Sequence, residues 1–134
     1  MAPAFTETVP WPGKSYIIRH QATGQAITLV DGKVCPDHWN SECNCTARWI
    51  CNERDGWLGF RNPVSCTYLG IGTSSSRGAI EVVDQGDICA RKNPDGGNIL
   101  LVKQRDSLLK IDVDNRDTLV TSARCGAVWV FSEI

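Results

Sequence analysis

The sequence predicts an all-β domain in which three related units of about 40 residues close around one shared core. Two observations predict this class: short runs of β-forming residues recur at even spacing, and one sequence pattern returns along the 134-residue chain. Helical periodicity is almost absent. The length fits one domain, because a single core commonly organises about 100 to 200 residues.

Seven runs rich in β-branched and aromatic residues are separated by clusters of Gly, Asn, Asp, Ser and Pro. We expect strands at residues 15–19, 25–30, 48–51, 78–83, 98–102, 108–113 and 128–131. Many short strands at fairly even spacing indicate a sandwich or a barrel. The repeats then decide between the two.

The first two repeats align without a gap. Residues 16–27 superpose on residues 58–69, which places Ile18 on Phe60. A third copy starts at Ile99, but its turn is more charged and leaves its register open by one residue. The strands that end the three copies lie 39 and 41 residues apart.

Three repeats, approximately 14–55, 56–96 and 97–134, therefore make up one domain. Each carries about four strands, which are too few to bury an apolar face alone, so the three must share a core. This arrangement is the β-trefoil, with pseudo-threefold symmetry. Two sets of core residues should then occupy threefold-related positions: Ile18, Phe60 and Leu101 in one apolar layer, and Trp49, Ile88 and Trp129 in another.

Two stretches of the chain carry a resemblance to known trefoil families. Residues 49–70, which run from Trp49-Ile-Cys through an Asp-Gly turn to Tyr68-Leu-Gly, resemble the repeat unit of fascin-like trefoils. The ending Ala127-Val-Trp-Val-Phe-Ser-Glu-Ile resembles the last strand of fungal ricin-B-like trefoil lectins. The resemblance covers nearly the whole chain and implies the fold. It says less about function, because trefoils host lectins, actin cross-linkers, protease inhibitors and growth factors.

The Gln-x-Trp signature of ricin-type sugar modules is missing. The three equivalent triplets begin with Ala47, Gly86 and Ala127. In the lectins that the chain resembles, that glutamine supports the sugar-binding turn, so its absence weakens carbohydrate binding at the usual sites. We expect Trp49 and Trp129, which end two of these triplets, to fill the core.

Charge and apolar content limit the partners and the compartment. Lys and Arg total 14 against 15 acidic residues, with a pI near 6.1, so no excess of positive charge favours nucleic acid as a partner.

No window approaches the roughly 20 apolar residues of a membrane span, and the start lacks the pattern of a secretory signal. We therefore expect a cytoplasmic protein with no membrane partner. Its seven cysteines should mostly be thiols without a fully formed disulfide framework.

The segment from Asp31 to Asn44 is the least repeat-like part of the chain, and we expect it to line the functional site. His38 supplies an imidazole that can exchange a proton with a ligand. Trp39 either folds back to plug the barrel or offers a flat apolar surface for stacking. Asp37 and Asn40 supply orienting hydrogen bonds.

The next candidate ligand-binding residues are His20 and Asn62, which follow Arg19 and Arg61 at equivalent strand ends. The favoured alternative is that these polar side chains stabilise their turns.

No metal or other cofactor is expected. Cys35, His38, Cys43 and Cys45 are ligands that zinc accepts, but their Cys-x-Cys spacing differs from the usual pairs of structural zinc sites. Catalytic residues cannot be named either, because no Gly-x-Ser-x-Gly elbow is present and His20 and His38 are the only histidines.

The first functional hypothesis is a small binding module, lectin-like or fascin-like, that holds a glycan, a protein or a small molecule. The alternative is a fungal-type cofactor-independent cyclase or isomerase of a small metabolite, which needs orientation and a few placed charges. A third hypothesis is an inhibitor that presents an exposed loop. A deep apolar cavity around a perturbed acid or base would favour the enzyme, and polar clefts with an exposed tryptophan would favour the lectin.

Overall fold

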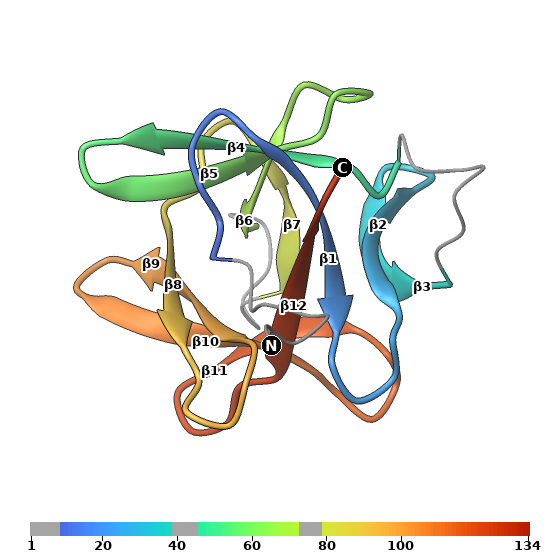
Figure 1. Ribbon diagram of the computed structural model, residues 1–134, viewed down its shortest axis with the longest axis vertical. Coiled ribbons are helices and arrows are strands. Elements are labelled where there is room, and N and C mark those ends of the chain that lie inside the picture. The colour runs from blue at the N-terminus through green and yellow to red at the C-terminus, as the bar shows by residue number, and fades with distance from the viewer. Residues whose placement is uncertain (1–8, 39–45, 73–78) are drawn as a thin grey trace, which may run out of the picture.

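The computed structural model describes residues 9–38, 46–72 and 79–134, and these form twelve strands (Figure 1). The first repeat contains β1 (Ser15–His20), β2 (Ala26–Val30), β3 (Lys33–Asp37) and β4 (Trp49–Arg54). The second contains β5 (Trp57–Arg61), β6 (Tyr68–Ile71), β7 (Ile80–Val83) and β8 (Ile88–Lys92). The third contains β9 (Asn98–Gln104), β10 (Ser107–Val113), β11 (Leu119–Ser122) and β12 (Val128–Glu133). In the part of the chain that the structure describes, no helix is long and apolar enough to cross a membrane.

Six strands form a closed antiparallel barrel. β1 pairs with β4, β4 with β5, β5 with β8, β8 with β9, β9 with β12, and β12 returns to β1. Each repeat contributes its first and last strands to this ring. Closure pairs every barrel strand on both sides, so the ring has no open edge.

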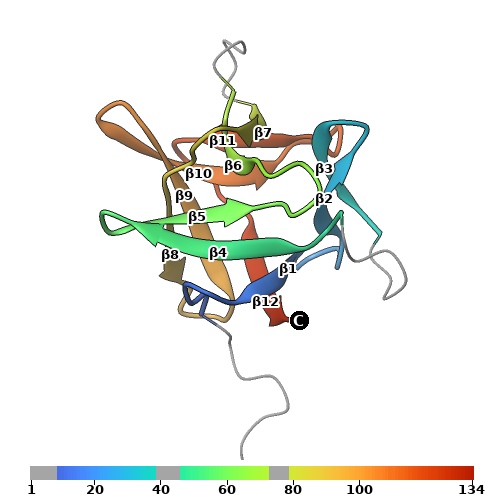
Figure 2. The same cartoon turned by 90° about the horizontal axis from the view of Figure 1, so that it is seen from above.

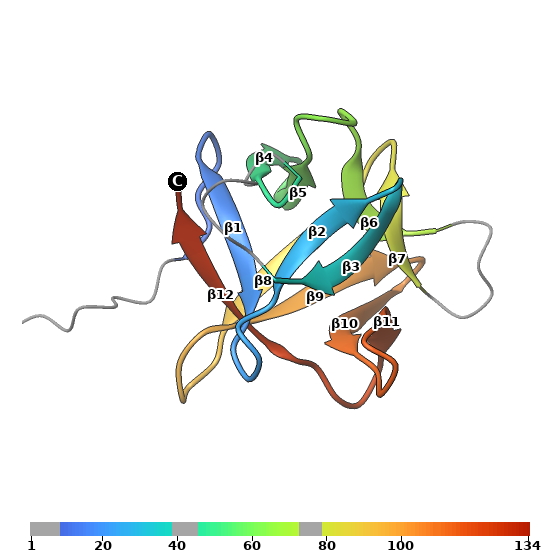
Figure 3. The ribbon, with the colours of Figure 1, turned by 90° about the vertical axis from the view of Figure 1, so that its right-hand side faces the viewer.

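The other six strands form three hairpins, β2–β3, β6–β7 and β10–β11, one from each repeat. Each hairpin pairs with the first strand of its repeat. Strands β3, β7 and β11 contact one another, so the hairpins gather as a cap on one end of the barrel (Figures 2 and 3). A six-stranded barrel with a three-hairpin cap is the β-trefoil that the repeats predict.

The predicted equivalence of Trp49, Ile88 and Trp129 is confirmed by the strand register. Within their own repeats they pair with Tyr16, Leu58 and Asn98, the same position each time. All three are fully buried. The two indoles also make the same hydrogen bond, because Nε1 of Trp49 donates to the Ile27 carbonyl at 2.8 Å and Nε1 of Trp129 to the Ile111 carbonyl at 3.2 Å.

The second predicted set is wrong by one residue in the third repeat. Ile18 faces Phe131 and Phe60 faces Cys51, whereas the residue in the same register of β9 is Leu100, which faces Ala90. Leu100 is fully buried in the main core, and Leu101 lies outside that cluster.

The cause of this error is the length of one turn. Ile27 follows Ile18 by nine positions, whereas Ile111 follows the equivalent Leu100 by eleven positions. The β9–β10 hairpin is therefore two residues longer than its counterparts.

The five cysteines that the structure describes, Cys35, Cys51, Cys66, Cys89 and Cys125, are free thiols. Cys43 and Cys45 lie outside the described residues. Burial raises the pKa of Cys51 to about 11, so this core thiol stays protonated at neutral pH.

Candidate functional site

The predicted site segment is only partly within the described residues. Asp37 ends β3 and His38 follows it, both exposed, and the Asp37 carboxylate accepts a hydrogen bond from the His38 backbone amide at 2.8 Å. Trp39 and Asn40 lie outside the described residues. The predicted pocket along this segment therefore stays a prediction.

The two predicted turn residues are held by the scaffold. The backbone amide of His20 donates to the Gln25 carbonyl at 2.7 Å, and that of Asn62 donates to the Thr67 carbonyl at 2.9 Å, so the two turns match. The His20 ring lies 5.4 Å from the Trp129 ring, centroid to centroid.

Asn62 is fully buried, and its amide group is occupied by the protein. Its Nδ2 donates to the Thr46 carbonyl at 3.1 Å and to the Arg48 carbonyl at 3.4 Å. Its Oδ1 accepts from the amides of Val64 and Ser65 at 2.9 and 3.4 Å. Asn62 therefore holds its turn against the end of the preceding repeat, which is the role that the structural alternative describes.

Among the described residues, no group of three or more His, Cys, Asp and Glu side chains is arranged to hold a metal ion. Burial, together with the neighbouring Asp37 carboxylate, raises the pKa of Cys35 and disfavours the thiolate that zinc binds. Cys43 and Cys45, the other two thiols of the predicted set, fall outside this part of the chain.

Two clefts meet at the segment that connects β7 to β8. The first, of about 570 Å³, lies between this segment, the β4–β5 hairpin and β6, and we name it the aromatic cleft. Trp57 and Tyr68 line it with their rings, and both are half-buried. Its polar lining includes Asn52, Glu53, Arg54, Asp84, Gln85 and Asp87.

Neighbouring residues fix the two rings of the aromatic cleft. Asn52 donates a hydrogen bond from Nδ2 to the Tyr68 hydroxyl at 3.2 Å. A Cβ at Gly59 would lie 3.1 Å from the Tyr68 ring, so the glycine leaves room for that ring against β5. Lys103 places its amine 5.4 Å from the centroid of the Trp57 ring, a cation–π contact.

Gly86 sits at the turn that both clefts share. A Cβ at this position would lie 1.8 Å from the Leu69 carbonyl oxygen, a backbone atom that cannot move without moving β6. Gly86 also occupies the place of the glutamine in the missing Gln-x-Trp signature. In this backbone arrangement no side chain fits at position 86.

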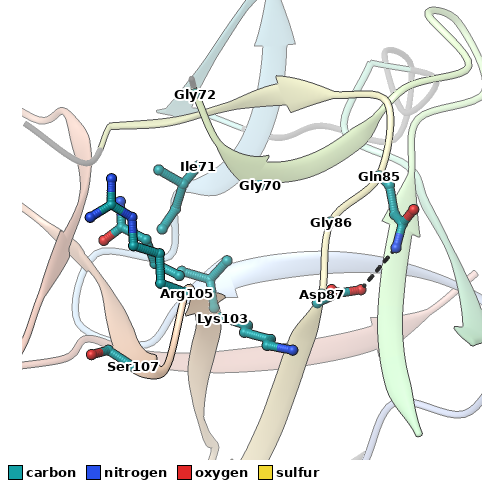
Figure 4. A pocket seen from close by; sticks show the side chains of 11 residues that line it. Gly70, Ile71, Gly72, Gln85, Gly86, Asp87, Lys103, Arg105 and Ser107 are labelled. Atoms are coloured by element: carbon teal, nitrogen blue, oxygen red, sulfur yellow. Dashed lines mark hydrogen bonds between the residues drawn. The ribbon is translucent and has the colours of Figure 1, made fainter. Parts of the chain in front are cut away.

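The second cleft, of about 760 Å³, lies on the other side of this turn, against the β9–β10 hairpin (Figure 4). We name it the cationic cleft because Lys103 and Arg105 line it. Gln104, Ser107 and Asp87 add further polar groups, and Gly70–Gly72 form its far wall. Gln85, Gly86 and Asp87 line both clefts, so the two are adjacent.

Sequence reasoning missed both clefts. Trp57 follows an Asp-Gly turn and Tyr68 begins β6, so the two rings come together only through the β5–β6 pairing. The sequence signal that points to the second cleft is the charged turn of the third repeat, residues 103–107.

The comparison with solved structures supports the fold, whereas no family model and no curated protein matches the sequence. A ricin B-like lectin from Macrolepiota procera, solved in complex with lactose, superposes with a TM-score of 0.68 at 19% identity, covering 95% of this chain and 91% of the lectin. The Rhizoctonia solani agglutinin superposes with a TM-score of 0.68 at 16% identity, covering 95% of this chain and 99% of the agglutinin.

A designed protein with threefold symmetry is also similar, with a TM-score of 0.67 at 14% identity over 90% of this chain and 99% of the design. This likeness agrees with the pseudo-threefold register of the barrel strands. The chain is therefore a β-trefoil protein, with ricin B-like lectins among its structural neighbours.

Proposed function

We propose that this protein is a binding module that holds a carbohydrate in the aromatic cleft. The observation that carries the proposal is the grouping of the Trp57 and Tyr68 rings with amide and carboxylate side chains in one cleft of about 570 Å³. An aromatic ring offers an apolar face to the C–H groups of a sugar ring. Amides and carboxylates bind the sugar hydroxyls, since between them they supply both donors and acceptors.

The two rings are held in place before any ligand arrives. Tyr68 is fixed by Asn52, and Trp57 carries the Lys103 amine over its ring. Lys103 lines the cationic cleft and not the aromatic cleft, so it stabilises the indole without occupying the aromatic cleft. Ordered binding groups reduce the entropy lost on binding.

The similarity to a lectin solved with lactose supports a sugar as the first ligand class to test. Because the second repeat has Gly86 in place of the signature glutamine, the proposal assigns sugar contacts to Trp57, Tyr68 and the polar side chains of the aromatic cleft instead. No observation on the described residues favours the cyclase or isomerase alternative, which stays a hypothesis.

The test is a glycan array followed by titration of the best ligand, with lactose included as a soluble probe. Trp57→Ala should weaken binding by about 0.5 to 1.5 kcal/mol, the usual contribution of an aromatic contact, which is roughly 2- to 13-fold in Kd. The matched control is Trp11→Ala, because Trp11 is 63% exposed and does not line the cleft. Thermal unfolding of both variants checks that they are folded.

Two results would refute the proposal. One is an array on which the folded protein binds no glycan. The other is a glycan that Trp57→Ala binds as tightly as the unmodified protein does.

A further inference from the structure

The three junctions between repeats are occupied differently. His20, Asn62 and Val102 hold equivalent places, since each follows the matched core residue of β1, β5 or β9 by two positions. His20 covers its junction by packing against Trp129. Asn62 covers its junction through hydrogen bonds to the Thr46 and Arg48 carbonyls.

The junction between the second and third repeats breaks this pattern. Val102 is a core residue with no polar group to reach across the junction. The backbone bond here, from the Lys103 amide to the Asp87 carbonyl at 2.9 Å, is shared with the first junction, where the Gln21 amide donates to the Val128 carbonyl at 2.9 Å. The β9–β10 hairpin is also two residues longer here. The cationic cleft lies at this junction, so it is a departure from the threefold symmetry and not a feature that the fold requires.

The charged side chains at this cleft point in different directions. Figure 4 shows the Lys103 amine on the side of Asp87 and the Arg105 guanidinium on the side of Ile71 and Gly72. Among the described residues, neither cation forms a salt bridge. The Asp87 carboxylate accepts a hydrogen bond from Gln85 at 3.4 Å.

Further acidic groups lie near the cleft, and one of them is Asp106, which is exposed in the turn between the lining residues Arg105 and Ser107. The Glu81 carboxylate packs against Gly72 but is not part of the cleft lining. The lining itself therefore carries two cations and one carboxylate. Lys103 is engaged over the Trp57 ring, which leaves the Arg105 guanidinium as the cationic group available to a ligand.

We propose that the cationic cleft is a second sugar subsite that selects a carboxylate-bearing sugar, with Arg105 binding the carboxylate. The inference rests on the proposed function, because the two clefts share the wall formed by residues 85–87 and would hold adjacent units of one acidic glycan. A guanidinium matches a carboxylate with two parallel hydrogen bonds. Ser107 and Gln104 supply hydrogen bonds for the sugar hydroxyls.

The test compares sugars that differ only in the carboxylate. Glucuronate against glucose, and galacturonate against galactose, are titrated into the labelled protein while backbone amide shifts are followed by NMR. Each uronate should bind roughly fivefold tighter than its neutral parent at low salt, the upper range for an exposed charge pair. The amides of residues 105–107 should shift with the uronates, and 0.5 M NaCl should remove the preference.

Arg105→Gln should abolish the preference of the uronates over their neutral parents. The matched control is Arg116→Gln, because Arg116 is exposed in the β10–β11 turn away from both clefts, and it should keep the preference. This inference would be overturned if each uronate bound no tighter than its neutral parent, or if the preference survived in Arg105→Gln. The proposed function would still stand in that case if sugar affinity depended on Trp57. Absence of binding by all four sugars and by every arrayed glycan would overturn both.

Discussion

Replacing Asn62 by alanine tests whether this residue holds the scaffold. The side chain is fully buried and takes part in four hydrogen bonds, of which those at 2.9 and 3.1 Å are the shortest. A buried hydrogen bond contributes about 1 kcal/mol, and a partner left unpaired costs about 1 to 3 kcal/mol. Thr46 keeps a second partner, since its carbonyl also accepts from the Leu29 amide at 2.9 Å. We therefore expect Asn62→Ala to lower the free energy of unfolding by about 2 to 4 kcal/mol.

Urea unfolding followed by tryptophan fluorescence measures this change. Asn115→Ala is the matched control, because Asn115 is exposed in the β10–β11 turn, and its effect should stay within about 0.5 kcal/mol. Sugar affinity of the folded fraction should be unchanged in Asn62→Ala, since this residue lines neither cleft. A loss of stability no larger than that of the control would refute the assignment of Asn62 to the scaffold.

Two further predictions concern the shared turn and the core thiol. Gly86→Ala should lower the free energy of unfolding by about 1 to 3 kcal/mol and weaken sugar binding, because the new Cβ meets the Leu69 carbonyl oxygen. Normal stability together with normal binding would show that this turn tolerates a side chain. Stability should also fall as the pH rises from 9.0, the ordinary thiol pKa, to about 11, because Cys51 stays protonated in the folded protein while it ionises in the unfolded chain. Unfolding free energies measured across this range should fall less steeply for Cys51→Ala, and equal slopes would contradict the argument.

The fold could be predicted because equivalent positions in the three repeats must occupy equivalent places in the structure, so the repeats can be compared with one another. The spacing of Trp49, Ile88 and Trp129 was enough to place one core layer, and the register confirms it. The short cap strands β3, β6 and β11 were not among the predicted runs. Length alone is not the reason, because β2 and β7 are as short and were predicted, but β3 contains Pro36 and β6 contains Gly70, which weaken a strand pattern.

The site was harder to predict because it depends on contacts between repeats. The prediction relied on the irregular segment around His38, which marks a departure from the repeat but does not show what it faces. Asn62 was correctly placed in a turn, yet only the structure shows that its amide is fully used within the protein. Trp57 and Arg105 belong to different repeats, and a sequence pattern gives no measure of such a distance.

Closure of the barrel by β1 and β12 has a consequence for biosynthesis. Ile18 pairs with Phe131, so the last contact of the ring joins segments 113 residues apart. Contacts this distant in sequence slow folding. At about 5 to 20 residues per second, a ribosome needs roughly 6 to 20 s to supply β12 after β1 has been made. During that interval β1 lacks its β12 partner, and an unpaired strand edge of this kind is open to pairing with other chains.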